Sequence, residues 1–421
     1  MSVPPATPAY PSPLRRAPAR AAANPYAFLH AGLHLLVAFS VLTIFFPDQG
    51  FTLQKISVSS LFLAAVACFI MQVARSAPAL RASRFTPVAG VLFTLLFLWC
   101  LTTIARGALL GVDRWITLLI NPDVGGLVWL LPFAALIGRA GRGEMLASLI
   151  PVMRIHLLLG MIVSAGTILV VGPENMVKQY WTGAGLLLLY GAPIFLLTGI
   201  GNRYHYWLAL TAQALASAVN FMMVARTGLA VSLVILVLGL WLGRARRTTR
   251  LRLMFGAFMI MALAWLVAPI MLEHLGRFWS VDTRSFIIEE VSADFGLKDW
   301  LVGRGALGTY FSPYFLYIKL HTPFAGGDYF ERSSIEIGYL HLVLKGGLVM
   351  AGLYFLIFWT ATMRALRFED RRLGDGLALI FLIHLAEMVI TGSAAFIPSR
   401  LMLWLLAGLA LSSARKKHFR Q

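Results

Sequence analysis

The sequence predicts an all-α, polytopic membrane protein with about 12 transmembrane helices and one large loop outside the membrane. Of its 421 residues, 59% are hydrophobic and 13% are charged, whereas soluble domains carry about 25% charged residues. Apolar runs recur along almost the whole chain, and a helix that crosses a bilayer needs roughly 20 apolar residues. This composition excludes an ordinary soluble enzyme.

Residues 1–27 are too rich in proline to fold alone, and we expect a disordered cytosolic tail. Apolar runs then predict spans at residues 28–46, 57–74, 87–105, 125–138, 155–172, 183–200, 205–224, 228–243, 252–272, 337–362, 376–393 and 398–413. Nine of them fall within residues 28–272 and three within 337–413, separated by a loop at 273–336. Residues 414–421 form a basic cytosolic tail.

The Lys and Arg residues that give the net charge of +18 are distributed along the chain as the predicted topology requires. Cytosolic loops of membrane proteins collect Lys and Arg. With a cytosolic N-terminus, 23 of the 36 Lys and Arg residues fall on the cytosolic side, and the bias alternates at every crossing. Both termini are therefore predicted in the cytosol. In a bacterium, the protein would lie in the inner (cytoplasmic) membrane among membrane lipids, with the long loop in the periplasm and no nucleic-acid partner.

A loop of about 64 residues without secondary structure would be unusual. Thr283–Ala293 shows helical periodicity, and Leu301–Tyr317 begins with glycines and continues into an aromatic run. We expect short amphipathic helices that lie on the outer membrane face or cap a cavity. The alternative is a merely solvated loop.

Arginines on the predicted outer side need a reason, because topology places arginine inside. Arg226 lies at the predicted boundary between two spans, and Arg284 and Arg304 lie in the long loop. Planar arginine donors bind phosphate oxygens in pairs, which makes a clamp for a lipid-linked pyrophosphate plausible on chemical grounds. The alternative is that these side chains extend to lipid headgroups.

Four segments occur in an order that resembles the O-antigen ligase and polymerase superfamily of membrane glycosyltransferases. They are ARTG at Ala225–Gly228, DTRSFIIEE at Asp282–Glu290, LVGRGALGTY at Leu301–Tyr310 and IEIGYLHLVLKGGL at Ile335–Leu348. The last is similar to a family pattern in which His, Asn or Ser, and Tyr-Leu precede a glycine. Alignment on Tyr339 and Gly347 places Glu336 where the family has its His.

The resemblance implies transfer of a glycan from undecaprenyl pyrophosphate to a sugar hydroxyl, with inversion at the anomeric carbon. Arg226 and Arg284 correspond to the family's two pyrophosphate-binding arginines. Glu336 is the expected base; alternatively it orients an arginine or only begins a helix. Candidate substrate-binding residues are Arg304, Arg332, Tyr339 and His321. The expected acceptor is a lipid A core sugar for a ligase, or another lipid-linked glycan for a polymerase.

No cofactor or metal is expected, since the sequence has no carboxylate cluster suited to a metal and its two cysteines lie in apolar runs. Two charges, Lys345 and Glu387, fall inside predicted spans at similar depths. Such charges are costly in a membrane unless they are paired. We expect them to pair with each other, with His384 one turn from Glu387.

The rival function from another class is a transporter of lipid-linked oligosaccharides. Twelve spans suit a transporter, and Lys345 with Glu387 would suit a proton relay. Transporters usually show internal repeats with broken helices in matching halves. The sequence shows no such repeat, and its polar residues concentrate in one loop, which favours an enzyme.

Overall fold

The computed structural model describes residues 24–45, 52–108, 124–171, 191–222, 226–244, 283–314, 316, 331–335, 337–390 and 398–412. Within these ranges the chain is mostly helical. The described part also contains a short antiparallel sheet, made of β1 (Tyr310–Phe311) and β2 (Glu331–Arg332), with Tyr310 opposite Arg332. The predicted span at residues 252–272 lies outside the described ranges.

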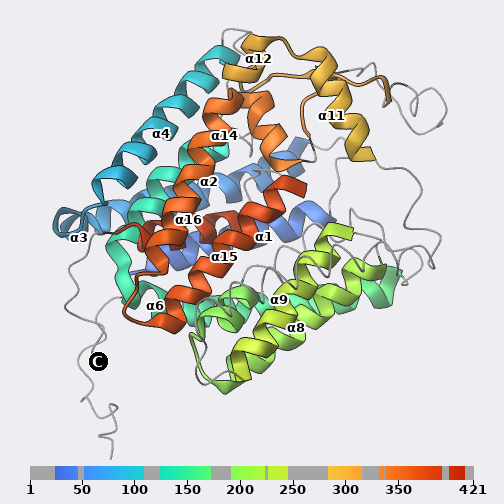
Figure 1. The fold of residues 1–421 in the computed structure, drawn as a ribbon. Coiled ribbons are helices and arrows are strands. Elements are labelled where there is room, and N and C mark those ends of the chain that lie inside the picture. The colour runs from blue at the N-terminus through green and yellow to red at the C-terminus, as the bar shows by residue number, and fades with distance from the viewer. Residues whose placement is uncertain are drawn as a thin grey trace, which may run out of the picture.

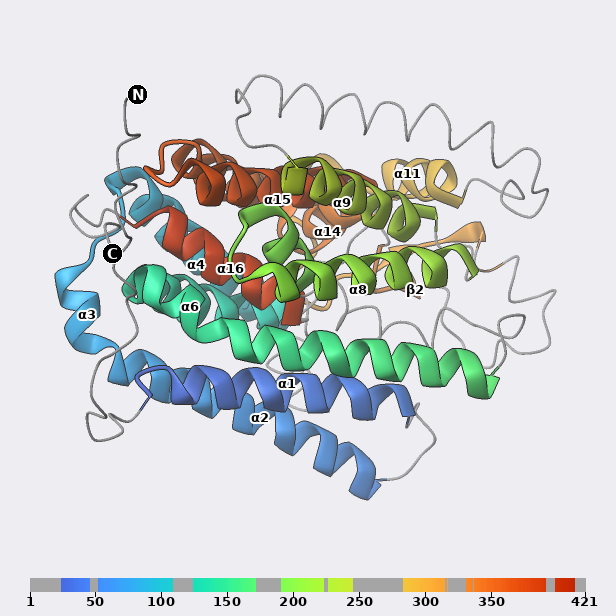
Figure 2. The same cartoon turned by 90° about the horizontal axis from the view of Figure 1, so that it is seen from below.

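Eight helices of the described part lie where the apolar runs predicted spans. They are α1 (Ala27–Phe45), α2 (Thr52–Arg75), α4 (Pro87–Ala108), α8 (Arg203–Met222), α9 (Arg226–Arg244), α14 (Gly338–Ala365), α15 (Arg371–Ile390) and α16 (Pro398–Ala410). The described residues include three helical stretches long and apolar enough to cross a membrane, namely Pro87–Gly107, Glu144–Val170 and Gly338–Ala365. Figures 1 and 2 show the helices gathered into one bundle.

The predicted cytosolic loop at residues 139–154 is helical in the structure, which corrects the sequence analysis. It belongs to α6 (Val124–Val171), which joins two of the predicted spans, and the ribbon of α6 changes direction along its length (Figure 1). Met145, Leu149 and Val152 are all buried, and their spacing places them on one face of a helix. Burial of this face keeps the segment helical despite its charges.

Two short helical elements lie between the longer ones. The first, α3 (Ala77–Ala82), links α2 to α4 at one edge of the bundle (Figure 2). The second, the π-helical turn η2 (Ile194–Thr198), is buried and ends at Gly199, which has a positive φ of 70°. A glycine tolerates this left-handed conformation without a steric penalty, so Gly199 ends this helical segment.

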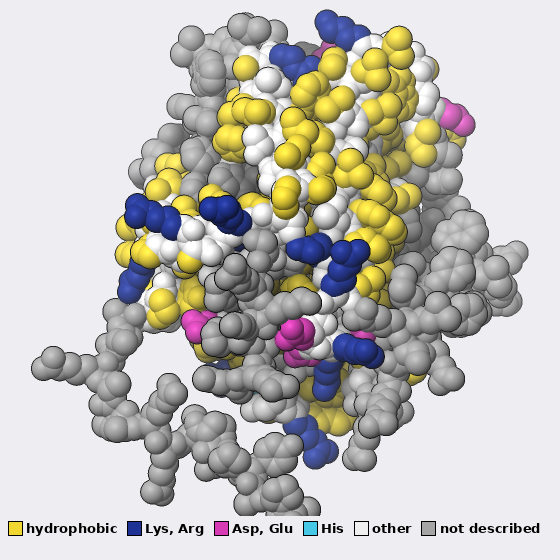
Figure 3. All heavy atoms as spheres, turned by 60° about the vertical axis from the view of Figure 1, so that its left-hand side comes forward, with side chains coloured by type: hydrophobic (Ala, Val, Ile, Leu, Met, Phe, Trp, Pro, Cys, Tyr) yellow, Lys and Arg dark blue, Asp and Glu magenta, His cyan; other side chains and the backbone are white. Residues whose placement is uncertain are grey.

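Apolar side chains cover much of the face that carries α4 (Figure 3). Leu95, Leu98 and Leu101 of α4 are all exposed there. A soluble protein rarely exposes so continuous an apolar surface, whereas a lipid bilayer would cover it at no cost. The exposed surface therefore agrees with the apolar composition in indicating a membrane protein.

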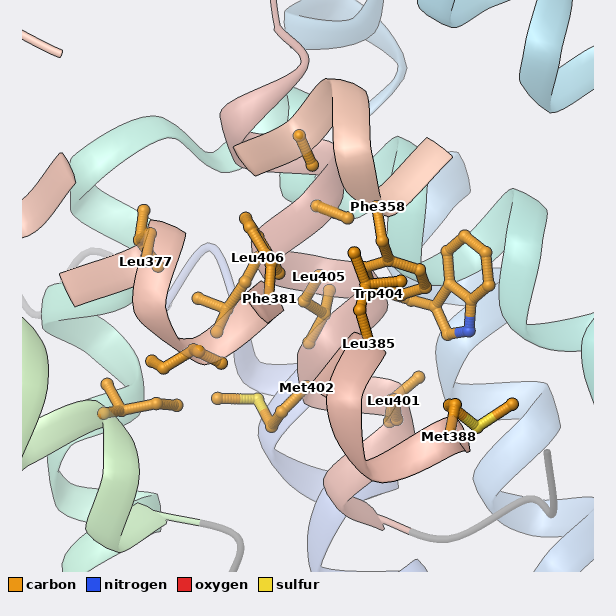
Figure 4. Close-up of a cluster of buried hydrophobic side chains, with 14 of the residues drawn as sticks. Phe358, Leu377, Phe381, Leu385, Met388, Leu401, Met402, Trp404, Leu405 and Leu406 are labelled. Atoms are coloured by element: carbon orange, nitrogen blue, oxygen red, sulfur yellow. The ribbon is translucent and has the colours of Figure 1, made fainter. Parts of the chain in front are cut away.

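Buried apolar side chains of α14, α15 and α16 gather in one cluster (Figure 4). Phe358 of α14, Phe381 of α15 and Trp404 of α16 are all buried, and the rings of Phe358 and Trp404 lie 4.8 Å apart. Large aromatic side chains contribute strongly to packing in such a core. This packing fixes the second half of α14 against its two neighbours.

Candidate functional site

Residues 283–314, 316 and 331–335 form a compact unit, called here the loop module, on the predicted outer loop. It contains α11 (Thr283–Asp294), α12 (Leu297–Val302), β1 and β2. Figure 1 shows α11 and α12 at one end of the bundle, beyond α14. The expectation of short helices within this loop is confirmed for the described residues.

Arg304 holds the loop module together. Its Nη1 donates to Asp294 Oδ2 at 2.5 Å and to Thr309 O at 2.9 Å. Its Nη2 donates to Asp294 O at 2.6 Å and to Asp299 Oδ2 at 3.0 Å, and the guanidinium lies over the Phe295 ring. Burial alone would lower the pKa of Arg304, but its hydrogen bonds to the two aspartates outweigh burial and raise the pKa.

These contacts change the role expected for Arg304. The sequence analysis placed this residue among the pyrophosphate or glycan ligands, yet both terminal nitrogens of its guanidinium already donate within the loop module. A bidentate phosphate contact would have to displace two charge-assisted hydrogen bonds. The structure therefore gives Arg304 an internal, supporting role.

A second carboxylate fixes the segment that follows β1. Glu290 of α11 accepts a hydrogen bond from Ser312 Oγ at 2.6 Å and another from the Tyr314 backbone N–H at 2.7 Å. Asp294, one turn later on the same helix, accepts from the Phe311 N–H. Two carboxylates of α11 thus accept hydrogen bonds from three groups between Phe311 and Tyr314.

The loop module is fastened to α14 at a break in that helix. Gly347 has φ 71° and ψ −176°, which is not helical, so the usual hydrogen bonds of this turn cannot form. The Arg304 N–H instead donates to Leu344 O at 2.8 Å, and the Gly305 N–H donates to Lys345 O at 3.0 Å. The glycine turn of the loop module replaces the bonds that α14 loses.

Side chains from α4 complete this junction. Trp99 Nε1 donates to Gly346 O at 2.7 Å, and Arg106 donates to Val302 O at 2.7 Å and to Gly303 O at 3.1 Å. A Cβ on Gly303 would come within 2.6 Å of backbone atoms of α14, so only glycine permits this approach. We call this contact of the Gly303–Gly305 turn with α4 and the break in α14 the glycine junction.

Lys345 lies inside the glycine junction rather than beside Glu387. Its side chain is 1% exposed, and Nζ donates to Gly308 O at 3.0 Å. A buried ammonium is costly unless strong acceptors surround it. The structure thus ties the charge of Lys345 to the loop module.

Glu387 has a different partner from the one expected. Arg400 of α16 donates to Glu387 Oε2 at 3.2 Å, and His384 Nδ1 lies 3.7 Å from the same oxygen. Arg400 Nη1 also hydrogen-bonds to His384 Nδ1. His384 Nε2 is in turn hydrogen-bonded to Tyr354 Oη at 2.8 Å. The proximity of His384 to Glu387 is confirmed.

The sequence analysis missed Arg400. It falls two residues inside the last predicted span, where a buried arginine needs a nearby anion. A search for a partner on the adjacent span would have found it. The expected pairing of Lys345 with Glu387 failed because depth along a helix does not determine which face a side chain occupies.

Two residues at the start of α14 lie beside the loop module. Tyr339 is half-buried, and its hydroxyl has no hydrogen-bond partner within the described part of the chain. The buried His341 accepts the Ile335 N–H at its Nδ1, at 3.1 Å, and so holds the backbone immediately before the helix. Arg332 donates to Tyr310 Oη at 3.3 Å, across the β1–β2 pair.

The remaining predicted site residues are located only by their positions along the chain. Arg226 begins α9, and Arg284 lies in the first turn of α11. Positions 321 and 336, the candidates His321 and Glu336, lie outside the described residues. A helix start carries positive partial charge, which adds to an arginine in attracting an anion.

No protein-family model and no curated protein sequence matches the chain. Within the described ranges, no group of three or more His, Cys, Asp or Glu side chains is arranged to hold a metal ion.

Proposed function

We propose that the protein is an inverting membrane glycosyltransferase that uses a glycan linked to undecaprenyl pyrophosphate as its donor. The acceptor is a hydroxyl of lipid A core for an O-antigen ligase, which we favour, or of another lipid-linked glycan for a polymerase. The reaction takes place on the periplasmic side of the bacterial inner membrane, and both termini lie in the cytosol.

The observation that carries this proposal is the glycine junction. The LVGRGALGTY and IEIGYLHLVLKGGL segments, on which the resemblance depends, lie far apart in the sequence but are hydrogen-bonded to each other through Arg304, Gly305, Leu344 and Lys345. The contact fastens the loop module to α14 at Leu344 and Lys345, in the helix whose first turn carries Tyr339. A rigid polar unit joined to an apolar helix can hold substrate-binding residues in place.

In this proposal Arg226 and Arg284 bind the pyrophosphate. The acceptor oxygen attacks the anomeric carbon, the bond from that carbon to the pyrophosphate oxygen breaks, and negative charge grows on the leaving pyrophosphate. Two arginines at helix starts stabilise this charge, which is often the largest catalytic contribution. Glu336 accepts the proton of the acceptor hydroxyl, unless it serves instead to orient one of the arginines.

His341 and Arg304 support this site without touching the substrate. His341 holds the Ile335 N–H, next to Glu336 in the chain, and Arg304 fixes the end of α11 through Asp294. Preorganised sites lose activity when such supports are loosened. Tyr339 offers a hydroxyl for the glycan.

Glu336→Gln tests the proposal. We expect loss of transfer with normal expression, whereas Glu369→Gln, an exposed carboxylate between α14 and α15, should leave transfer unchanged. Arg226→Ala and Arg284→Ala should each lower kcat by about 100-fold or more, while Arg367→Ala should not. Full activity in Glu336→Gln would remove that residue from the mechanism.

The surface glycans of a deletion strain decide between the acceptors. Lipid A core without O-chain, together with full-length polymer on undecaprenyl pyrophosphate, would identify a ligase. A single repeat unit on the core would identify a polymerase. Repeat units trapped on the cytosolic leaflet would contradict an enzyme and favour the transporter.

A further inference from the structure

Two aromatic rings of the loop module are stacked at its surface. Phe286 of α11 and Tyr314, after β1, have parallel rings with an interplanar angle of 1° and centroids 5.7 Å apart. Phe286 is 45% exposed. The pair belongs neither to the apolar core nor to the glycine junction.

Hydrogen bonds within the loop module hold this pair of rings in place. Glu290, one turn after Phe286 on α11, accepts the Tyr314 N–H at 2.7 Å and the Ser312 hydroxyl at 2.6 Å. The helix that carries the first ring therefore also fixes the backbone of the second. Hydrogen bonds to a carboxylate are stronger than those between neutral groups, so the backbone of Tyr314 is held firmly beside the exposed Phe286.

A second stacked pair differs from Phe286 and Tyr314 in what brings its rings together. Phe355 and Trp359 of α14 have nearly parallel rings 6.1 Å apart and are also exposed. They are four residues apart on one helix, where neighbouring side chains meet without any other support, and they lie in a stretch apolar enough to cross a membrane. Phe286 and Tyr314 come from separate segments and need tertiary contacts to meet.

We propose that Phe286 and Tyr314 form a platform on which a pyranose ring of the glycan substrate stacks. One face of a sugar ring presents C–H groups with partial positive charge, which suits the negative face of an aromatic ring. The inference rests on the proposed function, in which Arg284, in the first turn of α11, binds the pyrophosphate. The platform then receives the glycan on the same helix.

The surroundings favour a sugar over a lipid chain. Glu289, about one turn after Phe286 on α11, is exposed. Insertion of this face into the bilayer would bring the Glu289 carboxylate toward hydrocarbon, which is costly. A sugar supplies hydroxyl groups that such polar side chains can bind, and an acyl chain does not.

Direct binding tests the platform independently of catalysis. The probe is the soluble repeat oligosaccharide released by mild acid from the lipid-linked polysaccharide of the host strain, titrated against the full-length protein in nanodiscs. We expect Phe286→Leu to raise Kd about tenfold, the upper range for aromatic contacts, and Phe286→Tyr to retain binding. Phe355→Leu is the matched control and should leave Kd unchanged. Equal thermal midpoints establish that the variants are folded.

An unchanged Kd in Phe286→Leu, or no binding by the wild type, would overturn the platform. Strong quenching of Phe286→Trp fluorescence by brominated lipids would also overturn it, because lipid would then cover the rings. If the wild type transfers no glycan but Phe286→Leu still weakens oligosaccharide binding, the proposed enzyme fails and the platform stands. If transfer is normal and Kd is unchanged, only the platform fails.

Discussion

The loop module and the α14–α16 core are held together by different physical means. Arg304, Asp294, Asp299 and Glu290 organise the loop module through directional bonds between charged and polar groups. Around Phe358 and Trp404, the core packs apolar rings and encloses one polar network. From this difference we expect the bundle to tolerate changes in packing better than the loop module tolerates the loss of individual hydrogen bonds. A site built on the loop module is therefore precise but easily lost.

A substitution in the glycine junction, where the loop module meets α14, should have the largest effect on stability. In Gly347→Ala the new Cβ would come within 2.1 Å of Leu301 O, at a residue with φ 71°. We expect a loss of about 4 kcal/mol from the clash and the strained backbone, measured as a lower thermal midpoint and faster proteolysis of the loop module.

Gly352→Ala on the same helix is the matched control. Nothing lies within 4 Å of the added Cβ, and alanine favours the helix by about 1 kcal/mol. Similar midpoints for the two variants would contradict a specific role of the break at Gly347.

A substitution in the polar network of Arg400, Glu387 and His384 should have the next largest effect on stability. Arg400→Met leaves Glu387 without its guanidinium partner, and removal of one member of a buried pair costs about 3 kcal/mol. Adding Glu387→Gln removes the uncompensated charge and should recover much of this loss. A double-mutant cycle of thermal stability measures the coupling, and strictly additive effects would show that the pair is not coupled.

Within the loop module, Arg304→Lys should have a smaller effect. Lysine keeps the charge but cannot bridge Asp294 and Asp299 with a planar fork, and we expect a loss of about 2 kcal/mol confined to the module. Hydrogen exchange should rise in α11 and α12 and stay constant in α15. Lys298→Ala, an exposed position on α12, should leave all three helices unchanged, and faster exchange in α15 would refute the separation.

High salt should produce the smallest effect. At about 1 M salt the screening length falls to roughly 3 Å, which weakens the partly exposed bonds of Arg304. We expect exchange in α11 and α12 to rise by less than about fivefold while the apolar core is unaffected. An equal rise in hydrogen exchange in α15 would mean that salt weakens the loop module and the apolar core alike.

Several features of the candidate site were within reach of the sequence. The loop was expected to contain short helices, and the predicted helical stretch at Thr283–Ala293 lies close to the bounds of α11. The sequence did not indicate that the guanidinium of Arg304 would donate its hydrogen bonds within the loop module. These bonds depend on where Asp294, ten positions earlier at the end of α11, lies in the folded chain. Nor did the sequence predict that the Gly303–Gly305 turn would bind the backbone of α14.

Composition and hydropathy by themselves indicated a helical chain with segments long and apolar enough to cross a membrane, because apolar surface must be buried wherever the helices eventually pack. They located eight of the described helices within a few residues. Tertiary structure alone decided that α6 continues through a charged stretch, that Glu387 pairs with Arg400, and that Lys345 bonds to Gly308. Each of these outcomes depends on the direction of a side chain relative to a distant segment, and hydropathy along one helix contains no information about that direction.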